Sequence, residues 1–515
     1  MSAGYANAPT REKPLVQPLD QYNRALLDQV HPTDWPNPTP AKGYNLVVIG
    51  AGAGGLVSAL GAAGLGAKVA LVEKDRLGGD CLNVGCVPSK ALLRSARAFA
   101  DVREAGGYGV RVPDCATIDF PAVMERMRRL RARISCNDSA NRLREAGVDV
   151  FFGEGRFTGN DAIEVDGRIL RFSRAIIAAG ARPAIPDIAG LADAGYLTNE
   201  TVFWLTELPK RLAVIGAGPI GCELTQAFAR FGSNVHLLAG GFPLLGREDR
   251  DAAKVVEMSL SRDGVSINHP AKVIEVRREQ NEKILVLAKG SQRTELRVDE
   301  ILIATGRQPN VDTLNLEAAA VKYDTKKGVF VSDRLQTSNR RIFGVGDICS
   351  KYKFTHMSDA MARIALQNAL FFGRGKSNIL TVPWCTYTDP EVAHVGEYEN
   401  ESRNRGMEID TFTVELKKND RAIVDGEELG FLKVHVKKGS DKILGATLVA
   451  RHAGEMISQI TQAMSSGQGL KALSKTIYCY PTQAEIIKSV ANEYQRTRLT
   501  PWLKWALEKW LAWRR

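Results

Sequence analysis

"YNLVVIGAGAGGLVSALGAAGLGAKVALVEK", residues 44–74, is the stretch that decides the fold of this 515-residue chain. A β-branched apolar run leads into a glycine-rich turn. A stretch of small residues with helical character follows, and a second apolar run ends at Glu73. That order predicts a strand, a helix and a second strand lying parallel to the first. The stretch therefore indicates an α/β architecture.

The turn in this stretch has the spacing of a nucleotide-binding fingerprint. Gly50 permits the tight turn, Gly52 lets the backbone approach a pyrophosphate, and Gly55 lets helix and strand pack closely. The pyrophosphate would lie at the N-terminus of the helix. Glu73 stands where a carboxylate can bind a ribose hydroxyl pair. We therefore predict a first dinucleotide site of the Rossmann-like kind.

The same order of elements recurs at residues 211–240. Its second strand is followed by Ala239, so the expected ribose-binding acid is missing. This loss favours NADPH over NADH, although no arginine replaces the acid there. Arg247 is the nearest candidate, and capping of the next helix is its alternative role. The glycines of this second fingerprint are Gly216, Gly218 and Gly221.

Another repeated element shows how the two units are arranged. "AIIAAGARPAIP" (175–186) and "EILIATGRQPN" (300–310) each lead an apolar strand into a turn, at Gly180 and Gly306. The second unit is therefore expected to be inserted into the first. An α+β domain follows residue 380, because residues 430–450 alternate like two antiparallel strands with a turn between them and helical stretches follow at 452–467 and 483–498. The predicted parts are an N-terminal arm (1–42), a first dinucleotide-binding domain (43–187 and 309–379), a second, NAD(P)H-binding domain (188–308), a C-terminal α+β domain (380–499) and a tail helix (500–515).

Composition excludes several classes of function. The net charge is +11, but no basic run interleaves with aromatic residues, so nucleic-acid binding is not expected. Eight scattered cysteines favour a reducing, cytoplasmic environment over a disulfide scaffold. No secretory signal or membrane-spanning run is recognised. The arm is expected to drape over the body, with a disordered leader as the alternative.

"LGGDCLNVGCVPSK", residues 77–90, sets two cysteines four residues apart beside the first nucleotide site. A zinc site would need two more ligands, and no second Cys-x-x-Cys or His-x-x-x-His is present. Two inert buried thiols would not explain the surrounding glycines or the Pro-Ser-Lys that follows. A redox-active dithiol formed by Cys81 and Cys86 explains both, because a nearby lysine or helix N-terminus lowers a thiol pKa.

These motifs together resemble the FAD-dependent pyridine nucleotide–disulfide oxidoreductases, over roughly residues 44–499. The cysteine segment, both fingerprints, "ATGRQPN" and "TSNRRIFGVGD" carry the resemblance. It implies a homodimer in which residues 380–499 form the dimerisation domain. FAD would bind the first dinucleotide-binding domain (43–187 and 309–379) and NADPH or NADH the second (188–308), and the two cofactors would form an electron relay.

The resemblance also implies roles for individual residues. Cys86 would contact the flavin, and Cys81 would exchange with the substrate. Lys90 would lie beside the flavin and pair with Glu223, the alternative being two solvated surface charges. Asp347 would bind the ribityl chain of FAD, with a helix N-cap as the alternative role.

The chain departs from the disulfide reductases of this family near its C-terminus. Where they have His-Pro-Thr-x-x-Glu, this chain has Tyr480 and Glu485 in "YPTQAE". Tyrosine titrates near ~10 and transfers protons poorly to a thiol at neutral pH. Mercuric reductase also carries tyrosine there, and Tyr196 matches a second tyrosine of its metal pocket, with packing as the alternative role for both. The segment 246–251, "GREDRD", is also similar to the mercuric enzyme.

Two features of mercuric reductase are not found in the sequence. An N-terminal metal-binding domain with a cysteine pair is missing, and so is a C-terminal Cys-Cys. Cys479 could replace the latter as an auxiliary thiol, or be structural. Cys81 and Cys86 are nevertheless expected to hold Hg(II) transiently, since paired thiolates suit a soft metal ion. Another metal ion, a quinone or a small electrophile stays open as the electron acceptor.

The tail "LTPWLKWALEKWLAWRR" predicts an amphipathic helix. Its tryptophans and basic residues are typical of an interfacial membrane helix, and docking on the chain's own dimer is the alternative. We therefore predict a homodimeric flavoprotein of the mercuric-reductase type, with peripheral membrane contact through residues 500–515. A dihydrolipoamide-dehydrogenase-like enzyme and a membrane-recruited redox partner or sensor are the alternative interpretations.

Overall fold

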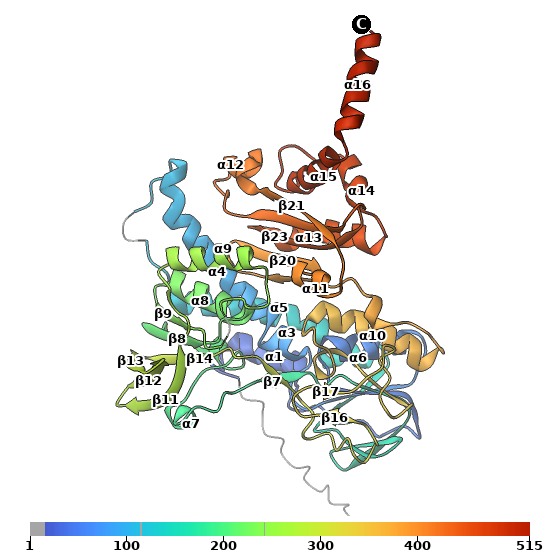
Figure 1. Ribbon diagram of the computed structural model, residues 1–515. Helices are drawn as coiled ribbons and strands as arrows, with labels where there is room; N and C mark the ends of the chain where they lie inside the picture. The colour runs from blue at the N-terminus through green and yellow to red at the C-terminus, as the bar shows by residue number, and fades with distance from the viewer. Residues whose placement is uncertain (1–15, 114–115, 242) are drawn as a thin grey trace, which may run out of the picture.

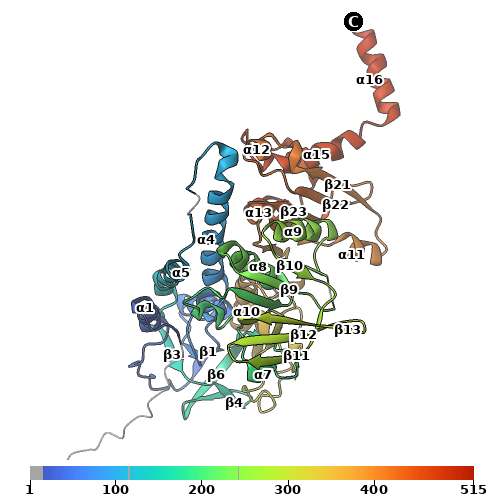
Figure 2. The same ribbon diagram turned by 90° about the vertical axis from the view of Figure 1, so that its left-hand side faces the viewer.

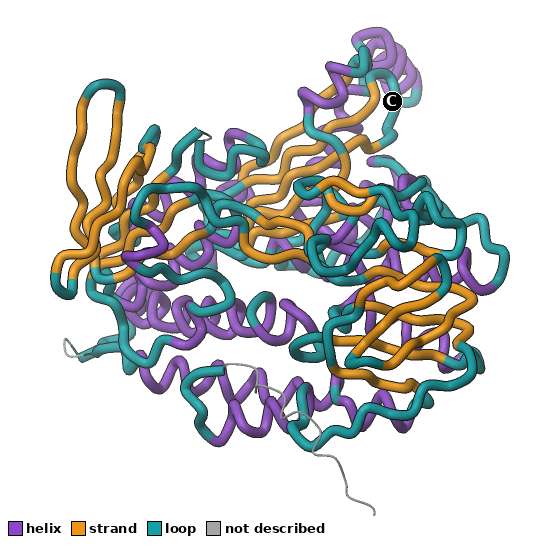
Figure 3. The backbone as a smooth tube through the Cα atoms, turned by 90° about the horizontal axis from the view of Figure 1, so that it is seen from below, coloured by secondary structure: helices purple, strands orange, loops and turns teal. Residues whose placement is uncertain are grey.

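The computed structural model describes residues 16–113, 116–241 and 243–515. The two nucleotide-binding regions lie side by side, and the C-terminal region covers them from above (Figure 1). Seen from below, the strands of these two regions form groups on opposite sides of the molecule (Figure 3).

The first region is built on a seven-stranded sheet in the order β3-β2-β1-β6-β5-β4, with β18 also beside β6. Strands β3, β2, β1, β6 and β18 are joined in parallel, whereas β5 pairs in antiparallel fashion with β6, and β4 with β5. Helices α2 and α10 pack together over the sheet, so its central strands are almost continuously apolar. The bounds are β1 Tyr44–Ile49, α2 Ala53–Gly64, β2 Val69–Glu73, β3 Val148–Phe152, β4 Arg156–Gly159, β5 Ala162–Val165, β6 Arg168–Ile177, β18 Ile342–Gly344 and α10 Thr355–Leu370.

The second region repeats this arrangement on a smaller scale. Its parallel sheet has the order β10-β9-β8-β14, and a three-stranded antiparallel sheet, β11-β12-β13, follows it. Both predicted strand–helix–strand units are therefore confirmed. The bounds are α7 Leu191–Ala194, β8 Arg211–Ile215, α8 Pro219–Phe231, β9 Asn234–Leu238, α9 Arg250–Arg262, β10 Ser266–Asn268, β11 Lys272–Glu279, β12 Glu282–Lys289, β13 Gln292–Val298 and β14 Glu300–Ile303.

The two repeated glycine turns, at Gly180 and Gly306, lie beside each other in the structure. Strand β7 (Ala181–Pro183) follows the first turn and pairs in antiparallel register with β15 (Arg307–Pro309), which follows the second. The chain thus enters and leaves the second region through two adjacent strands.

The C-terminal region is an α+β unit around a five-stranded antiparallel sheet, β19-β20-β23-β22-β21. The bounds are β19 Pro383–Thr386, β20 Glu391–Gly396, α11 Glu399–Asn404, β21 Ile409–Glu415, α12 Asp420–Val424, β22 Phe431–Lys437, β23 Ile443–Ala450, α13 Ala453–Ser465, α14 Leu470–Lys475 and α15 Glu485–Thr497. The hairpin and two long helices that the sequence predicts here are confirmed. The domain boundaries themselves stay a prediction.

The described part of the N-terminal arm packs on the body, as expected of an arm that drapes over it. Helix α1 (Gln21–Val30) lies against α5 (Phe120–Ser135), and Leu26 and Val30 are fully buried. Residues 1–15 lie outside the described residues. The remaining elements are α3 Gly79–Asn83, α4 Cys86–Glu104, α6 Ala140–Glu145, β16 Tyr323–Asp324, β17 Gly328–Val329 and the tail helix α16 Pro501–Trp513.

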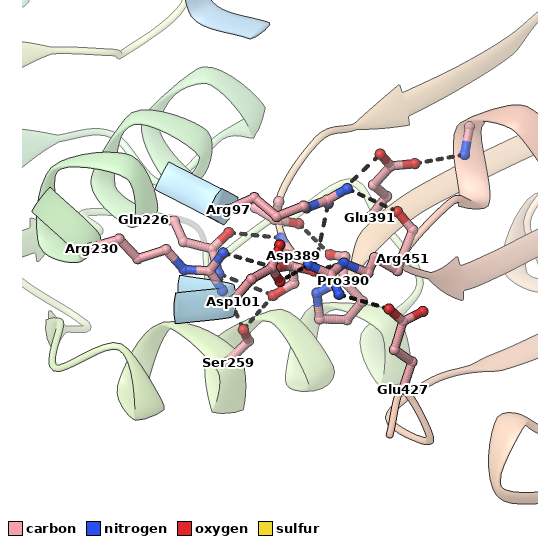
Figure 4. A network of polar contacts seen from close by, with 12 residues as sticks. Arg97, Asp101, Gln226, Arg230, Ser259, Asp389, Pro390, Glu391, Glu427 and Arg451 are labelled. Atoms are coloured by element: carbon pink, nitrogen blue, oxygen red, sulfur yellow. Dashed lines mark hydrogen bonds and ion pairs between the residues drawn. The ribbon is translucent and has the colours of Figure 1, made fainter. Parts of the chain in front are cut away.

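A polar network joins the three regions at the carboxylate of Asp389 (Figure 4). Arg230 of α8 donates to one oxygen at 2.8 Å, and Arg97 of α4 lies 3.5 Å from the other. The backbone of Asp389 bonds Gln226 of α8 and Ser259 of α9. Burial raises the pKa of this carboxyl, but the arginines outweigh burial and hold the pKa below its ordinary value.

Arg451 extends the same network toward the C-terminal helices. Its guanidinium pairs with Asp101 of α4 and, at 2.7 Å, with Glu427 (Figure 4). Glu427 in turn accepts from Gln483 at 2.6 Å. Helix α4, which begins at Cys86, is therefore linked by polar contacts to the segment that carries Tyr480.

Candidate active site

The two cysteines lie at the junction of α3 and α4. Cys81 is in α3 and Cys86 is the first residue of α4, with Gly85 between the helices. A Cβ atom on Gly85 would lie 2.7 Å from the carbonyl oxygen of Asp80, so only glycine fits this bend. Both thiols are free in this structure.

The environment separates the two thiols in acidity. The hydrogen bond from Cys81 is the largest cause that lowers the pKa of Cys86, to about 6; Thr355, whose hydroxyl lies 3.4 Å from Sγ, and Lys90 add to it against burial. The same hydrogen bond and burial raise the pKa of Cys81. The pair therefore holds one thiolate and one thiol near neutral pH, which is the reactive form of a dithiol.

Lys90 and Glu223 form the predicted pair. The Lys90 ammonium lies 2.7 Å from a carboxylate oxygen of Glu223 and 4.4 Å from the centroid of the Tyr387 ring. The other carboxylate oxygen accepts from the backbone N–H of Tyr387 at 2.9 Å. The Glu223 side chain is only 5% exposed, so the alternative of two solvated surface charges is wrong. Their roles toward a flavin stay a prediction.

The first fingerprint has the geometry of a pyrophosphate cradle. Gly50 adopts φ +95°, and a Cβ atom on Gly55 would lie 1.8 Å from the carbonyl oxygen of Gly50. Gly52 occupies the N-cap position of α2, so no side chain caps this helix. Its first N–H groups are therefore free to bind an anion. Glu73 accepts from the backbone N–H groups of Ala51 and Asp75 at 2.7 and 2.8 Å.

The cysteine segment packs directly on this cradle. A Cβ atom on Gly79 would lie 2.7 Å from the Cα atom of Gly52, so the two backbones are in contact. The segment that carries the dithiol therefore lies directly against the first nucleotide site. We did not single out Gly79 from the sequence, although its position in the Gly-Gly before Cys81 was a usable signal.

Asp347 belongs to a charged cluster that includes an arginine missed by the sequence analysis. The Nε atom of Arg307 lies 3.4 Å from Asp347, and Nη2 of Arg307 pairs with Asp80, beside Cys81. Burial raises the pKa of Asp347, against the opposing effect of Arg307. Asp347 lies within a short 3-10 turn and caps no helix, so that alternative is wrong. Arg307 directly follows Gly306 in the repeated turn, and this was the available signal.

The turn glycines Gly180 and Gly306 both adopt positive φ, +69° and +121°. A Cβ atom at either would meet nothing within 4 Å, so the space beside both turns is open. The two segments bond across to each other: the Gly180 carbonyl accepts from the N–H of Asn310, and the Gly306 carbonyl accepts from the N–H of Ala184. This arrangement leaves room for a ligand and is compatible with the cofactor contacts predicted from the sequence.

The second fingerprint repeats the first. Gly216 has φ +113°, and a Cβ atom on Gly221 would lie 2.0 Å from the carbonyl oxygen of Gly216. Gly218 occupies the N-cap position of α8, so no side chain caps this helix. Arg247 is exposed, and the residue that caps α9 is Asp249, whose carboxylate accepts from the backbone N–H groups of Asp251 and Ala252. Capping of that helix by Arg247 is therefore wrong, whereas a role toward a nicotinamide cofactor stays a prediction.

Tyr196 and Tyr480 are not in contact with the thiols within one chain, as far as the described residues go. Tyr196 packs against the apolar core of the second region. Three residues later, Asn199 donates to the carbonyl of Val84 in the cysteine segment at 3.2 Å. Tyr480 is 71% exposed, and its hydroxyl donates to Asp420 at 3.1 Å. Glu485 accepts from the N–H of Thr482 at 3.4 Å.

A buried arginine supports the cysteine segment from behind. Arg131 of α5 is fully buried and donates to the carbonyl of Asn83 at 2.6 Å and to Asn23 of α1 at 2.7 Å. Burial is the main cause that lowers its pKa to about 10. No sequence motif marks Arg131, because its partners lie 48 and 108 positions away.

The residues present fit two dinucleotides. Both cradles combine an uncapped helix N-terminus with a glycine at which a side chain would obstruct the approach of a phosphate. Among the described residues, no group of three or more His, Cys, Asp or Glu side chains is arranged to hold a metal ion. A transient metal-binding role of Cys81 and Cys86 stays a prediction.

Fold and site together define a flavin- and pyridine-nucleotide-dependent oxidoreductase with a dithiol redox centre. The chain belongs to the pyridine nucleotide–disulphide oxidoreductases: that family's model matches residues 44–362, and the model of its dimerisation domain matches residues 382–491. Members of this family use FAD and NAD(P)H, and the dimerisation domain supports a homodimer.

The relatives carry different names. The chain is 32% identical to mercuric reductase of Staphylococcus aureus, over 88% of this chain and 83% of the relative. It is also 32% identical to dihydrolipoyl dehydrogenase of the same organism, over 87% and 96%. A solved Cu(II) complex of the HOCl-induced flavoprotein disulfide reductase RclA from Escherichia coli is 28% identical, with a TM-score of 0.77 and coverage of 88% and 99%. LpdA from Mycobacterium tuberculosis gives a TM-score of 0.80 at 26% identity, over 87% and 99%.

Proposed function

We propose that this chain is a mercuric-reductase-like enzyme that transfers electrons from NAD(P)H, through Cys81 and Cys86, to a soft metal ion. The site lies at the interface of a homodimer, in which Tyr480, Glu485 and Tyr196 complete the surroundings of the thiols. NADPH is the favoured donor because β9 is followed by Ala239, where an acid that binds the ribose of NADH would otherwise stand.

The observation that carries the proposal is the group at position 480. Reduction of a disulfide substrate releases a thiolate, which must be protonated by a nearby acid. Tyr480 donates to Asp420, and this hydrogen bond raises the pKa of a group that already titrates near ~10. Reduction of a metal ion held by the two cysteines splits no disulfide bond of a substrate, so the tyrosine is no disadvantage when the acceptor is a metal.

The thiols suit such an acceptor. Cys81, the thiol that exchanges with the substrate, binds the metal ion once its proton has left, and Cys86, the thiolate beside the flavin, supplies the second sulfur. The Asn83 carbonyl that Arg131 holds and the bend at Gly85 fix the distance between the two sulfurs. FAD, when bound, supplies the two-electron transfer between nicotinamide and dithiol.

Three alternatives have an observation in their favour. The identity to dihydrolipoyl dehydrogenase equals that to mercuric reductase, which supports a disulfide substrate. The Cu(II) complex of RclA supports a copper ion in place of mercury. The exposed tail helix supports a membrane-recruited redox partner, and residues 500–515 are proposed to contact the inner face of a membrane from the cytoplasm.

The test compares acceptors on the purified holoenzyme. NADPH oxidation is measured with Hg(II) in excess thiol, with Cu(II) and with lipoamide, for the wild type and for Tyr480→His. We expect turnover with a metal ion in the wild type and a gain of lipoamide activity in Tyr480→His. Brisk lipoamide reduction by the wild type, without metal turnover, would overturn the proposal. If none of these acceptors supports NADPH oxidation, a protein partner would be the favoured acceptor instead.

A further inference from the structure

The tail helix α16 stands apart from the rest of the molecule. It projects from the end of α15 in both views (Figures 1 and 2), and none of its residues is buried. Within the described residues, its side-chain contacts are internal: Thr500 caps Leu503, and the Trp510 ring lies 5.3 Å from that of Trp513. The helix is therefore formed without support from the body.

The composition of α16 is unfavourable for a helix surrounded by water. Trp502, Trp505, Trp510 and Trp513 are 72%, 56%, 52% and 76% exposed, and Leu503, Leu507 and Leu511 are also exposed. An apolar patch of this kind, rimmed by charge, marks a surface that binds something.

The charges indicate the chemistry of the partner. Lys504, Lys509, Arg514 and Arg515 stand against one acid, Glu508. Two further arginines, at positions 496 and 498, precede the helix, so the excess of positive charge continues to its base. The partner that this surface complements is both apolar and anionic.

We propose that α16 binds the surface of a membrane rich in anionic phospholipid, lying in the plane of the interface with its tryptophans at the boundary between headgroups and acyl chains. This inference rests on the part of the proposed function that brings residues 500–515 to a membrane, and it is independent of the electron acceptor. It adds the lipid class and the orientation. Tryptophan and basic side chains are the residues that settle at this depth.

Length argues against insertion across the bilayer. A helix of 13 residues is about 20 Å long, and the hydrocarbon core is about 30 Å thick. Among the described residues, no helix is long and apolar enough to cross a membrane.

The position of Lys509 argues against a second copy of the chain as the partner. It lies four residues from both Trp505 and Trp513, so its ammonium is on the apolar side of the helix. A dry protein interface would bury this charge at high cost. At a lipid surface the same side chain can extend between the indole rings to a phosphate group.

The test is flotation of the dimeric holoenzyme with vesicles of phosphatidylcholine alone or with about 30 mol% phosphatidylglycerol. Three tail variants are compared with the wild type: deletion of 500–515, Trp502→Ala/Trp510→Ala/Trp513→Ala, and Lys504→Gln/Lys509→Gln. Phe372→Ala/Met258→Ala is the matched control, because it removes exposed apolar side chains from the body. NADPH oxidation and sedimentation velocity are recorded for each variant.

We expect the wild type and the control to float with the anionic vesicles, and the deletion and tryptophan variants to bind about tenfold less or not at all. The lysine variant should lose the preference for anionic lipid, and wild-type tryptophan emission should shift to the blue on binding. Equal flotation of the wild type and the deletion variant would overturn the inference. So would loss of the dimer on deletion, which would assign the helix to a second copy. NADPH oxidation should be the same in all variants, so this outcome is separate from the test of the acceptor.

Discussion

At the residue scale, the central feature is the unequal acidity of the two thiols. The hydrogen bond from Cys81 is the largest cause that lowers the pKa of Cys86, and Lys90 adds a smaller effect. In Cys81→Ala this bond is lost, so the pKa of Cys86 should rise from about 6 toward about 8. Alkylation of reduced enzyme, followed against pH, measures it: the wild-type rate should fall only below about pH 6, and the variant rate already below about pH 8.

Cys136 is the control for this measurement, since it is exposed and lies outside the site. Cys136→Ala should leave the titration of Cys86 unchanged. An unshifted titration in Cys81→Ala would contradict the hydrogen-bonded dithiol.

Glu223 carries the second residue-scale prediction. Its carboxylate holds the Lys90 ammonium and the N–H of Tyr387 together. Glu223→Gln keeps an acceptor for the N–H but removes the charge that pairs with Lys90. We expect NADPH oxidation to fall about tenfold with little loss of folding, because Lys90 is then no longer held in place. Glu257→Gln, an exposed acid on α9, is the control; equal rates for the two variants would refute a role in catalysis.

At the element scale, the glycine turns make the strand–helix–strand units possible. A Cβ atom on Gly55 would overlap the carbonyl of Gly50, whereas one on Gly64, in the same helix, would meet nothing within 4 Å. Gly55→Ala should therefore abolish flavin binding, and Gly64→Ala should keep it and stabilise the fold by about 0.5 kcal/mol. Flavin absorbance of the purified variants measures the first, and thermal unfolding the second. Full flavin content in Gly55→Ala would contradict the role of this turn as the pyrophosphate site of the flavin.

The network around Asp389 links α4, α8 and α9 to the C-terminal sheet. Asp389→Asn keeps the backbone bonds to Gln226 and Ser259 and removes only the charge that faces the arginines. We expect a loss of about 2 kcal/mol near neutral pH. The folded pKa of Asp389 lies below its unfolded value, so the stabilisation is present above the unfolded pKa of ~3.9 and is lost as pH falls through the folded pKa.

The midpoint of urea unfolding, measured against pH, tests this prediction. The wild type and Asp389→Asn should converge on acidification and differ most near neutral pH. Glu408→Gln, which changes an exposed acid, should follow the wild type throughout. A constant difference at every pH would mean that the charge of Asp389 does not stabilise the fold.

Much of this scale could be predicted from the sequence, because strands, helices and turns depend on local patterns. The two fingerprints, the repeated turns, the C-terminal hairpin and the tail helix all followed from residues close together in the chain. Arg131, the ion pairs of Arg307 and the Asp389 network could not be found this way, although Arg307 itself stands in one of the repeated turns. Their partners are separated from them by tens to hundreds of residues, and no periodicity records such contacts.

At the scale of the whole molecule, the thiols and Tyr480 do not meet within one chain, so the proposed site needs the dimer. Mixing Cys81→Ala with Tyr480→Ala subunits tests this. A mixed dimer then contains one site with both residues intact and one site with neither. If Tyr480 acts on the partner's thiols, reassociated mixtures should recover roughly a quarter of wild-type activity from two inactive parents. No recovery would show that Tyr480 acts, if at all, within its own chain.

The central claim is that electrons from NADPH reach a metal ion through Cys81 and Cys86. The most direct test is to collect the elemental mercury that the holoenzyme releases from Hg(II) in excess thiol and compare it with the NADPH consumed. The account predicts about one atom of mercury per NADPH, since both are two-electron changes, and no mercury from Cys81→Ala. NADPH consumption without elemental mercury, or equal mercury release by Cys81→Ala, would contradict the account.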